Sequence, residues 1–154
     1  MGAKKLLFFL FVLVFTVSIV ASENIQEPNA MFPPNAIINA AYRGDERMVR
    51  EILASGSVDK NVRDAIGETA LHLAIFQSNI NVVKLLLDYG FDPNAVTTGK
   101  GYTPLHNAVL ANNAEAARLL IQYGARKRIR CSDGFTPFDL AKKREIGPLI
   151  QILL

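Results

Sequence analysis

A hexapeptide pattern occurs three times along this chain of 154 residues, beginning at Gly67, Gly101 and Gly134. The copies read Gly-Glu-Thr-Ala-Leu-His, Gly-Tyr-Thr-Pro-Leu-His and Gly-Phe-Thr-Pro-Phe-Asp, and they start 34 and 33 residues apart. A unit of that length is too short to bury an apolar face alone, so it is stable only when it stacks on a neighbour. The repeat therefore predicts a stack of small helical units, whose function lies on an extended surface rather than in one deep pocket.

Each unit carries the signals of two short helices. Thr69, Thr103 and Thr136 stand where a side-chain hydroxyl can cap a helix, and Pro104 and Pro137 follow at the first helical position. Apolar residues then recur at the spacing of one helical face, in two runs per unit. The same phase divides the chain into four units, which span about 35–60, 61–93, 94–127 and 128–154.

The N-terminal segment has a different pattern. Lys4 and Lys5 precede an apolar run, Leu6–Val20, which the small residues Ala21 and Ser22 follow. This order is typical of a secretory signal peptide with cleavage after Ala21 or Ser22. This run of 15 residues is shorter than the roughly 20 that a membrane-spanning helix needs.

We therefore expect a signal peptide at residues 1–22, a flexible Pro-containing linker at 23–34 and a folded domain at 35–154. The protein would be exported, to the periplasm or beyond the cell. The alternative is a retained N-terminal segment that anchors the protein to a membrane.

Charge is distributed unevenly along the chain. Residues 23–117 hold seven Lys or Arg and eleven Asp or Glu, whereas residues 118–154 hold eight and three. Once the signal peptide is removed the two signs nearly balance, so we expect no nucleic-acid partner. The basic end would face an acidic partner or membrane headgroups, or it would simply keep the last unit soluble. Cys131 is the single cysteine, so no internal disulfide can form.

The pattern resembles the ankyrin repeat. The matching residues are the runs Asp64–Ala74 (DAIGETALHLA) and Val82–Asn94 (VVKLLLDYGFDPN), and Thr103–His106 (TPLH) repeats part of the first. The resemblance covers the chain after the linker. It implies an all-α ankyrin-repeat solenoid of four helix-turn-helix units with hairpin-like loop fingers. The departures are an extra loop residue near Lys100 and a basic run at Arg126–Arg130.

The histidines are the first candidates for chemistry. His72 and His106 lie one per unit, with no Cys or second His beside either, which is a poor spacing for a metal site. The resemblance implies instead that they make buried hydrogen bonds between repeats. No nucleophile, phosphate-binding or paired-carboxylate motif occurs. We therefore expect no enzyme activity, no metal and no cofactor.

The resemblance further implies that another protein binds the concave face and the fingertips. Carried over position by position, the contact residues are Tyr42, Arg43, Ile66, Glu68, Phe76, Gln77, Lys100, Tyr102, Leu110, Phe135, Lys143 and Arg144. The six apolar members would form one exposed stripe, namely Tyr42, Ile66, Phe76, Tyr102, Leu110 and Phe135. The competing interpretation is that some of them pack onto neighbouring fingers as filler.

The sequence thus predicts an exported, monomeric adaptor or inhibitor that binds a partner protein. Two alternatives stay open. One is an envelope scaffold or stress-response protein that an uncleaved N-terminus holds at the membrane, and the other is an effector secreted to contact host proteins.

Overall fold

The structure is a computed structural model that describes residues 32–154, so the predicted signal peptide and most of the linker lie outside the described residues. The described part contains eight α-helices and no strand. In chain order they are α2 (Ala36–Arg43), α3 (Glu46–Ala54), α4 (Ala70–Phe76), α5 (Ile80–Asp88), α6 (Pro104–Leu110), α7 (Ala114–Gln122), α8 (Pro137–Lys143) and α9 (Gly147–Leu153). Consecutive helices pair into units 1 to 4, which confirms the expected all-α solenoid of four helix-turn-helix units.

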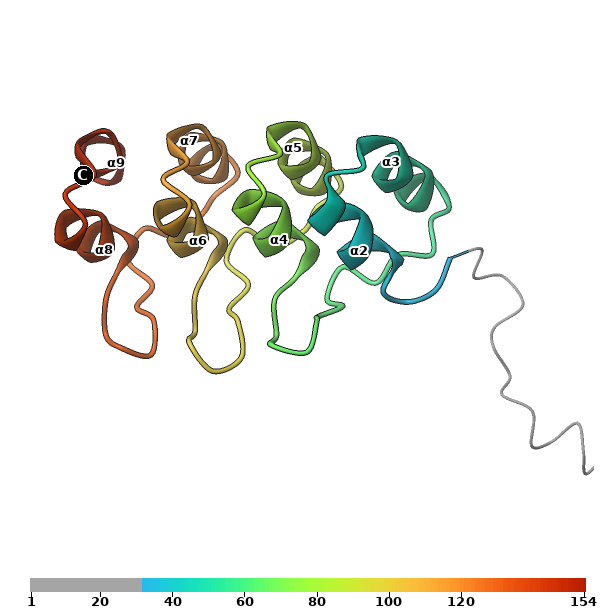
Figure 1. Cartoon of the computed structure of the whole chain (residues 1–154), viewed down its shortest axis with the longest axis horizontal. Coiled ribbons are helices and arrows are strands. Elements are labelled where there is room, and N and C mark those ends of the chain that lie inside the picture. The colour runs from blue at the N-terminus through green and yellow to red at the C-terminus, as the bar shows by residue number, and fades with distance from the viewer. Residues whose placement is uncertain (1–31) are drawn as a thin grey trace, which may run out of the picture. The chain divides into compact units, whose positions relative to one another are not determined.

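The units stack side by side in two helical layers (Figure 1). The first helices α2, α4, α6 and α8 form one layer, and the second helices α3, α5, α7 and α9 form the other. The loops that lead into α4, α6 and α8 project from the first layer as three fingers. None of the described helices exceeds nine residues, and within residues 32–154 none has the length and hydropathy needed to cross a membrane.

One continuous core runs through the stack, from Ile37 in unit 1 to Leu153 in unit 4. Leu86 on α5 and Leu120 on α7 are completely buried. Phe32, which the sequence places in the linker, is half-buried against this core. Because each unit buries its apolar face only against its neighbours, the four units depend on one another for stability.

Side-chain caps explain where the second helices begin. Asp45, Asn79 and Asn113 precede α3, α5 and α7, and each accepts a hydrogen bond from the backbone N–H three residues on, at 2.9–3.1 Å. Ile146 precedes α9 and has no group that can do so. Unit 4 therefore lacks a cap that is worth about 1 kcal/mol in the other three.

Hairpin-like backbone bonds hold the fingers. The N–H groups of Asp64 and Cys131 donate to carbonyls four residues ahead, whereas that of Thr97 donates to Tyr102, five residues ahead. The finger of unit 3 thus carries the predicted extra residue near Lys100. Gly67 in the finger of unit 2 has φ +80°, and a Cβ there would lie 2.5 Å from the Thr98 nitrogen, so only glycine fits this close approach.

Candidate partner-binding groove

A groove of about 530 Å³ lies beside α2, α4 and the finger of unit 2. We call it the unit 1–2 groove, and its lining residues are Ile38, Asn39, Tyr42, Asp64, Ile66, Glu68, Leu73 and Phe76. The buried side chains of Ile38 and Leu73 belong to the core cluster, so they give the groove an apolar base.

Three large apolar side chains of this groove are exposed. Tyr42 is 56% exposed, Ile66 65% and Phe76 62%. They come from the end of α2, the finger of unit 2 and the end of α4, so three separate segments converge on one surface. Exposed apolar groups gathered in this way mark an interaction site more often than single exposed residues do.

Two carboxylates share the groove with these apolar groups. The Asp64 Oδ1 atom accepts hydrogen bonds from the backbone N–H groups of Ile66, at 3.0 Å, and Glu68, at 2.8 Å. The Glu68 Oε1 atom accepts one from the Asn107 amide at 3.2 Å. Within residues 32–154 no cationic nitrogen lies within 4.0 Å of either carboxylate. Arg63 on the same finger donates instead to the carbonyls of Gly67, at 2.9 Å, and Val96, at 2.6 Å, so both carboxylates are held in place without an ion pair.

Buried histidines fix the fingers from below. The Thr69 N–H donates to His72 Nδ1 at 3.3 Å, so the ring proton is on Nε2, which donates to the Tyr102 carbonyl at 3.1 Å. His106 repeats this arrangement, with Thr103 and with the Phe135 carbonyl at 3.0 Å. The inter-repeat hydrogen bonds that the resemblance implied are thus confirmed.

Burial also sets the charge state of these rings. Desolvation lowers the pKa of His72 to about 4, and it lowers the pKa of His106 as well. Both imidazoles are therefore neutral at pH 7, as donation from a backbone N–H to Nδ1 requires. Each ring therefore fixes the finger of the following unit relative to its own helix.

A second hollow lies between the fingertips of units 2, 3 and 4. We call it the finger hollow, and it is lined by Ile66, Glu68, Thr97, Thr98, Gly99, Lys100, Tyr102, Ser132 and Asp133. The Ser132 N–H and hydroxyl donate to the carbonyls of Lys100 and Gly99, at 2.9 and 2.7 Å. The Lys100 ammonium lies 3.8 Å from the Asp133 carboxylate. Its cation is therefore partly neutralised within the chain.

The apolar residues predicted for units 3 and 4 are half-buried rather than exposed. The Tyr102 ring stacks on the His106 ring, with 5.7 Å between centroids. The Lys143 ammonium lies 4.8 Å above the Phe135 ring. The six-residue exposed stripe expected from the sequence is therefore wrong for Tyr102, Leu110 and Phe135, because the chain's own side chains pack against Tyr102 and Phe135 and Leu110 is half-buried.

Some of the other predicted contact residues lie outside both the unit 1–2 groove and the finger hollow. Arg43 and Gln77 are exposed but line neither the unit 1–2 groove nor the finger hollow. Arg144 is exposed and donates to the Leu110 carbonyl at 2.9 Å. Sequence reasoning missed Asn39 and Asp64, which do line the groove. Asp64 is a residue type common in turns, so the sequence alone does not indicate that it lines the groove.

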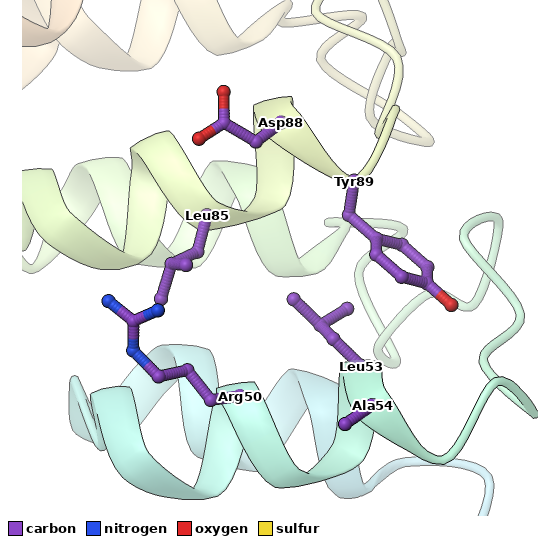
Figure 2. A pocket seen from close by; sticks show the side chains of 6 residues that line it. All are labelled: Arg50, Leu53, Ala54, Leu85, Asp88 and Tyr89. Carbon is purple, nitrogen blue, oxygen red and sulfur yellow. The ribbon is translucent and has the colours of Figure 1, made fainter.

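A hollow on the second-helix layer offers a contrast (Figure 2). It is lined by Arg50, Leu53, Ala54, Leu85, Asp88 and Tyr89, and Arg50 extends from α3 toward Leu85 on α5. Its charged residues are satisfied locally, because Arg50 pairs with Glu46 at 2.7 Å and Asp88 with Lys84 at 2.6 Å. This hollow is a packing seam between α3 and α5, whereas the unit 1–2 groove has carboxylates without cationic partners.

Among residues 32–154 no three His, Cys, Asp or Glu side chains gather closely enough to hold a metal ion. The stacked two-helix units, with their finger loops and lateral groove, define a repeat protein built for binding. The family described as "Ankyrin repeats (3 copies)" matches residues 11–97, and "Ankyrin repeats (many copies)" matches residues 77–121. This chain belongs to the ankyrin-repeat family, whose members are typically non-enzymatic scaffolds for protein interaction.

Similar proteins come from distant organisms. The chain is 41% identical over 56 residues to the BTB/POZ domain and ankyrin repeat-containing protein NPR1 of Malus hupehensis. This match covers 36% of the present chain and 10% of that protein. It is 39% identical over 56 residues to palmitoyltransferase akr1 of Schizosaccharomyces pombe, covering 36% and 9%. A putative ankyrin repeat-containing protein of Treponema pallidum is 37% identical over 59 residues, covering 38% and 20%. The matched segments thus span about a tenth of the first two relatives.

Proposed function

We propose that this chain is an exported, monomeric ankyrin-repeat protein that binds a partner protein through the unit 1–2 groove, as an adaptor or inhibitor. The observation that carries the proposal is the convergence of Tyr42, Ile66 and Phe76 on one surface, each more than half exposed. Aromatic side chains in such positions dominate interface energies, at about 2 kcal/mol or more each. The finger hollow extends the surface toward Lys100 and Tyr102.

Binding is tested with purified protein as bait and an exported-protein fraction as prey. Each captured protein is then purified, and its affinity is measured by titration calorimetry. Phe76→Ala should weaken the affinity by about 2 kcal/mol, or roughly thirtyfold, because the ring is a central anchor of the groove. Met48→Ala is the matched control, since Met48 is an exposed apolar residue on α3 outside the groove. Equal loss in both variants, or in neither, would remove the groove from the mechanism.

Export is supported by the sequence of residues 1–22, with its lysines, apolar run and small residues. Mass spectrometry of the protein from its native host should find an N-terminus at Ser22 or Glu23. An intact N-terminus in the membrane fraction would favour the anchored scaffold instead. Recovery of the cleaved protein from the culture medium would favour secretion toward host proteins.

The anchored scaffold has one observation of its own. Arg126, Lys127 and Arg128 line a hollow beside Phe138 and Leu154, and within residues 32–154 no carboxylate lies within 4.0 Å of these cations. Such a cluster suits anionic headgroups. Co-sedimentation with phosphatidylserine vesicles, lost in Arg126→Gln/Arg128→Gln and absent with phosphatidylcholine, would support this second candidate.

A further inference from the structure

We propose that the unit 1–2 groove selects an extended segment of the partner protein in which a Lys or Arg stands beside an aromatic or aliphatic residue. The inference rests on the proposed function, which gives the groove a protein partner, and it adds the chemical class of the segment that enters. The inference is argued from the charges and the apolar walls of the groove.

The groove is lined by two negative charges that form no ion pair within residues 32–154. Asp64 and Glu68 line it, and no Lys or Arg does. Glu68 also lines the finger hollow, where Lys100 is paired with Asp133. A cationic side chain that enters from either hollow therefore meets Glu68 without first displacing a cation of this chain.

Both carboxylates keep oxygen atoms available for a ligand. The intramolecular bonds use Asp64 Oδ1 and Glu68 Oε1, and none is formed by the second oxygen of either group. A carboxylate offers about four acceptor positions, and bonds from Lys or Arg are stronger than neutral ones. Because the backbone and Asn107 already hold the two groups, a ligand loses little of its binding energy to ordering them.

The apolar part of the ligand is placed by the same geometry. Tyr42, Ile66 and Phe76 surround the groove, so an aromatic or aliphatic side chain of the ligand is covered while its neighbouring cation reaches Glu68 or Asp64. An acidic segment is repelled here and would instead favour α8, where Lys142, Lys143 and Arg144 are exposed.

A phage-displayed library of random peptides tests this selectivity. Peptides of about 12 residues extend to roughly 40 Å, enough to cross the groove in any register. The library is selected on the full protein and counter-selected on Phe76→Ala, which leaves only groove-dependent peptides. We expect these to carry Lys or Arg within three positions of an aromatic or aliphatic residue, and to be depleted in Asp and Glu.

Charge variants then test the role of Glu68 with the recovered peptides. Glu68→Gln removes the charge but keeps an oxygen that can accept from Asn107, and we expect about fivefold weaker binding. Glu68→Lys should weaken binding more than about tenfold. Glu115→Lys makes the same charge change at an exposed position on α7, outside the groove, and should change affinity less than about twofold. Thermal unfolding of each variant shows whether the fold is intact.

The outcomes separate this inference from the proposed function. If no peptide depends on Phe76, the groove does not bind protein segments and both proposals fail. If peptides depend on Phe76 but are neutral or acidic, or bind Glu68→Gln and Glu68→Lys as tightly as the unaltered protein, only the charge selectivity fails. Equal weakening by Glu115→Lys would assign the effect to overall charge and would also overturn it.

Discussion

The two halves of the repeat array present their apolar side chains differently. In units 1 and 2 Tyr42 and Phe76 leave more than half of their surface in solvent. In units 3 and 4 the chain packs against its own aromatic residues, since His106 stacks on Tyr102 and Lys143 lies over Phe135. At the position that Phe76 holds in unit 2, unit 3 has Leu110, which is half-buried, and unit 4 has Lys143. The residues that differ between the copies therefore decide which surface stays free for a partner.

The largest expected effect on stability comes from the apolar core, which runs through both halves. Leu86 in unit 2 and Leu120 in unit 3 are both completely buried. Leu86→Ala and Leu120→Ala should each lower the free energy of unfolding by about 2–5 kcal/mol, through lost burial and a cavity. Urea titrations measure both. A loss below about 1 kcal/mol in one variant only would mean that the halves differ in their interior as well as on their surface.

The next effect comes from the histidines that link the units. The pKa of His72 is lowered from 6.5 to about 4, so the unfolded chain takes up a proton that the folded chain excludes. The stability that neutral His72 provides is complete above pH 6.5 and is lost as the pH falls toward 4. It should decrease by about 1 kcal/mol at pH 5.5 and by about 3 kcal/mol at pH 4.

Urea titrations between pH 7.5 and 5.5 check this window, where ordinary carboxylates stay ionised in both states. His106 acts in the same direction because burial lowers its pKa too. NMR titration of the imidazoles assigns the effect to each ring. A folded His72 that titrates near 6.5 would contradict the prediction and would place that ring in contact with water.

The third effect should separate the two halves directly. Phe135 is half-buried against the core, so Phe135→Ala should cost about 2 kcal/mol of stability, roughly half the loss for a fully buried ring. Phe76 is exposed, so Phe76→Ala should change stability by less than about 0.5 kcal/mol and act on binding instead. Differential scanning calorimetry compares the two. Equal losses would mean that the two halves differ less than their exposures indicate.

The sequence predicts the scaffold better than the site, for physical reasons. Caps and turns depend on a few residues close together in the chain, so Thr103, Pro104 and the glycine pattern are sufficient to place helices and fingers. Exposure of Phe135 depends on where Lys143 extends, and that follows from the packing of α8 against its own finger. The unpaired state of Glu68 depends likewise on which cations lie near it in space. Side-chain exposure and ion pairing of this kind depend on contacts between residues that only the folded stack brings together.

The smallest expected effect tests whether the Lys143 ammonium keeps the Phe135 ring covered. Lys143→Gln removes the charge over Phe135, which at an exposed site is worth about 0.5–1 kcal/mol. The free energy of unfolding should fall by about that amount, measured by urea titration, and Lys142→Gln, one residue away on α8, serves as the control. Unchanged stability would show instead that the backbone, and not the cation, sets the exposure of Phe135.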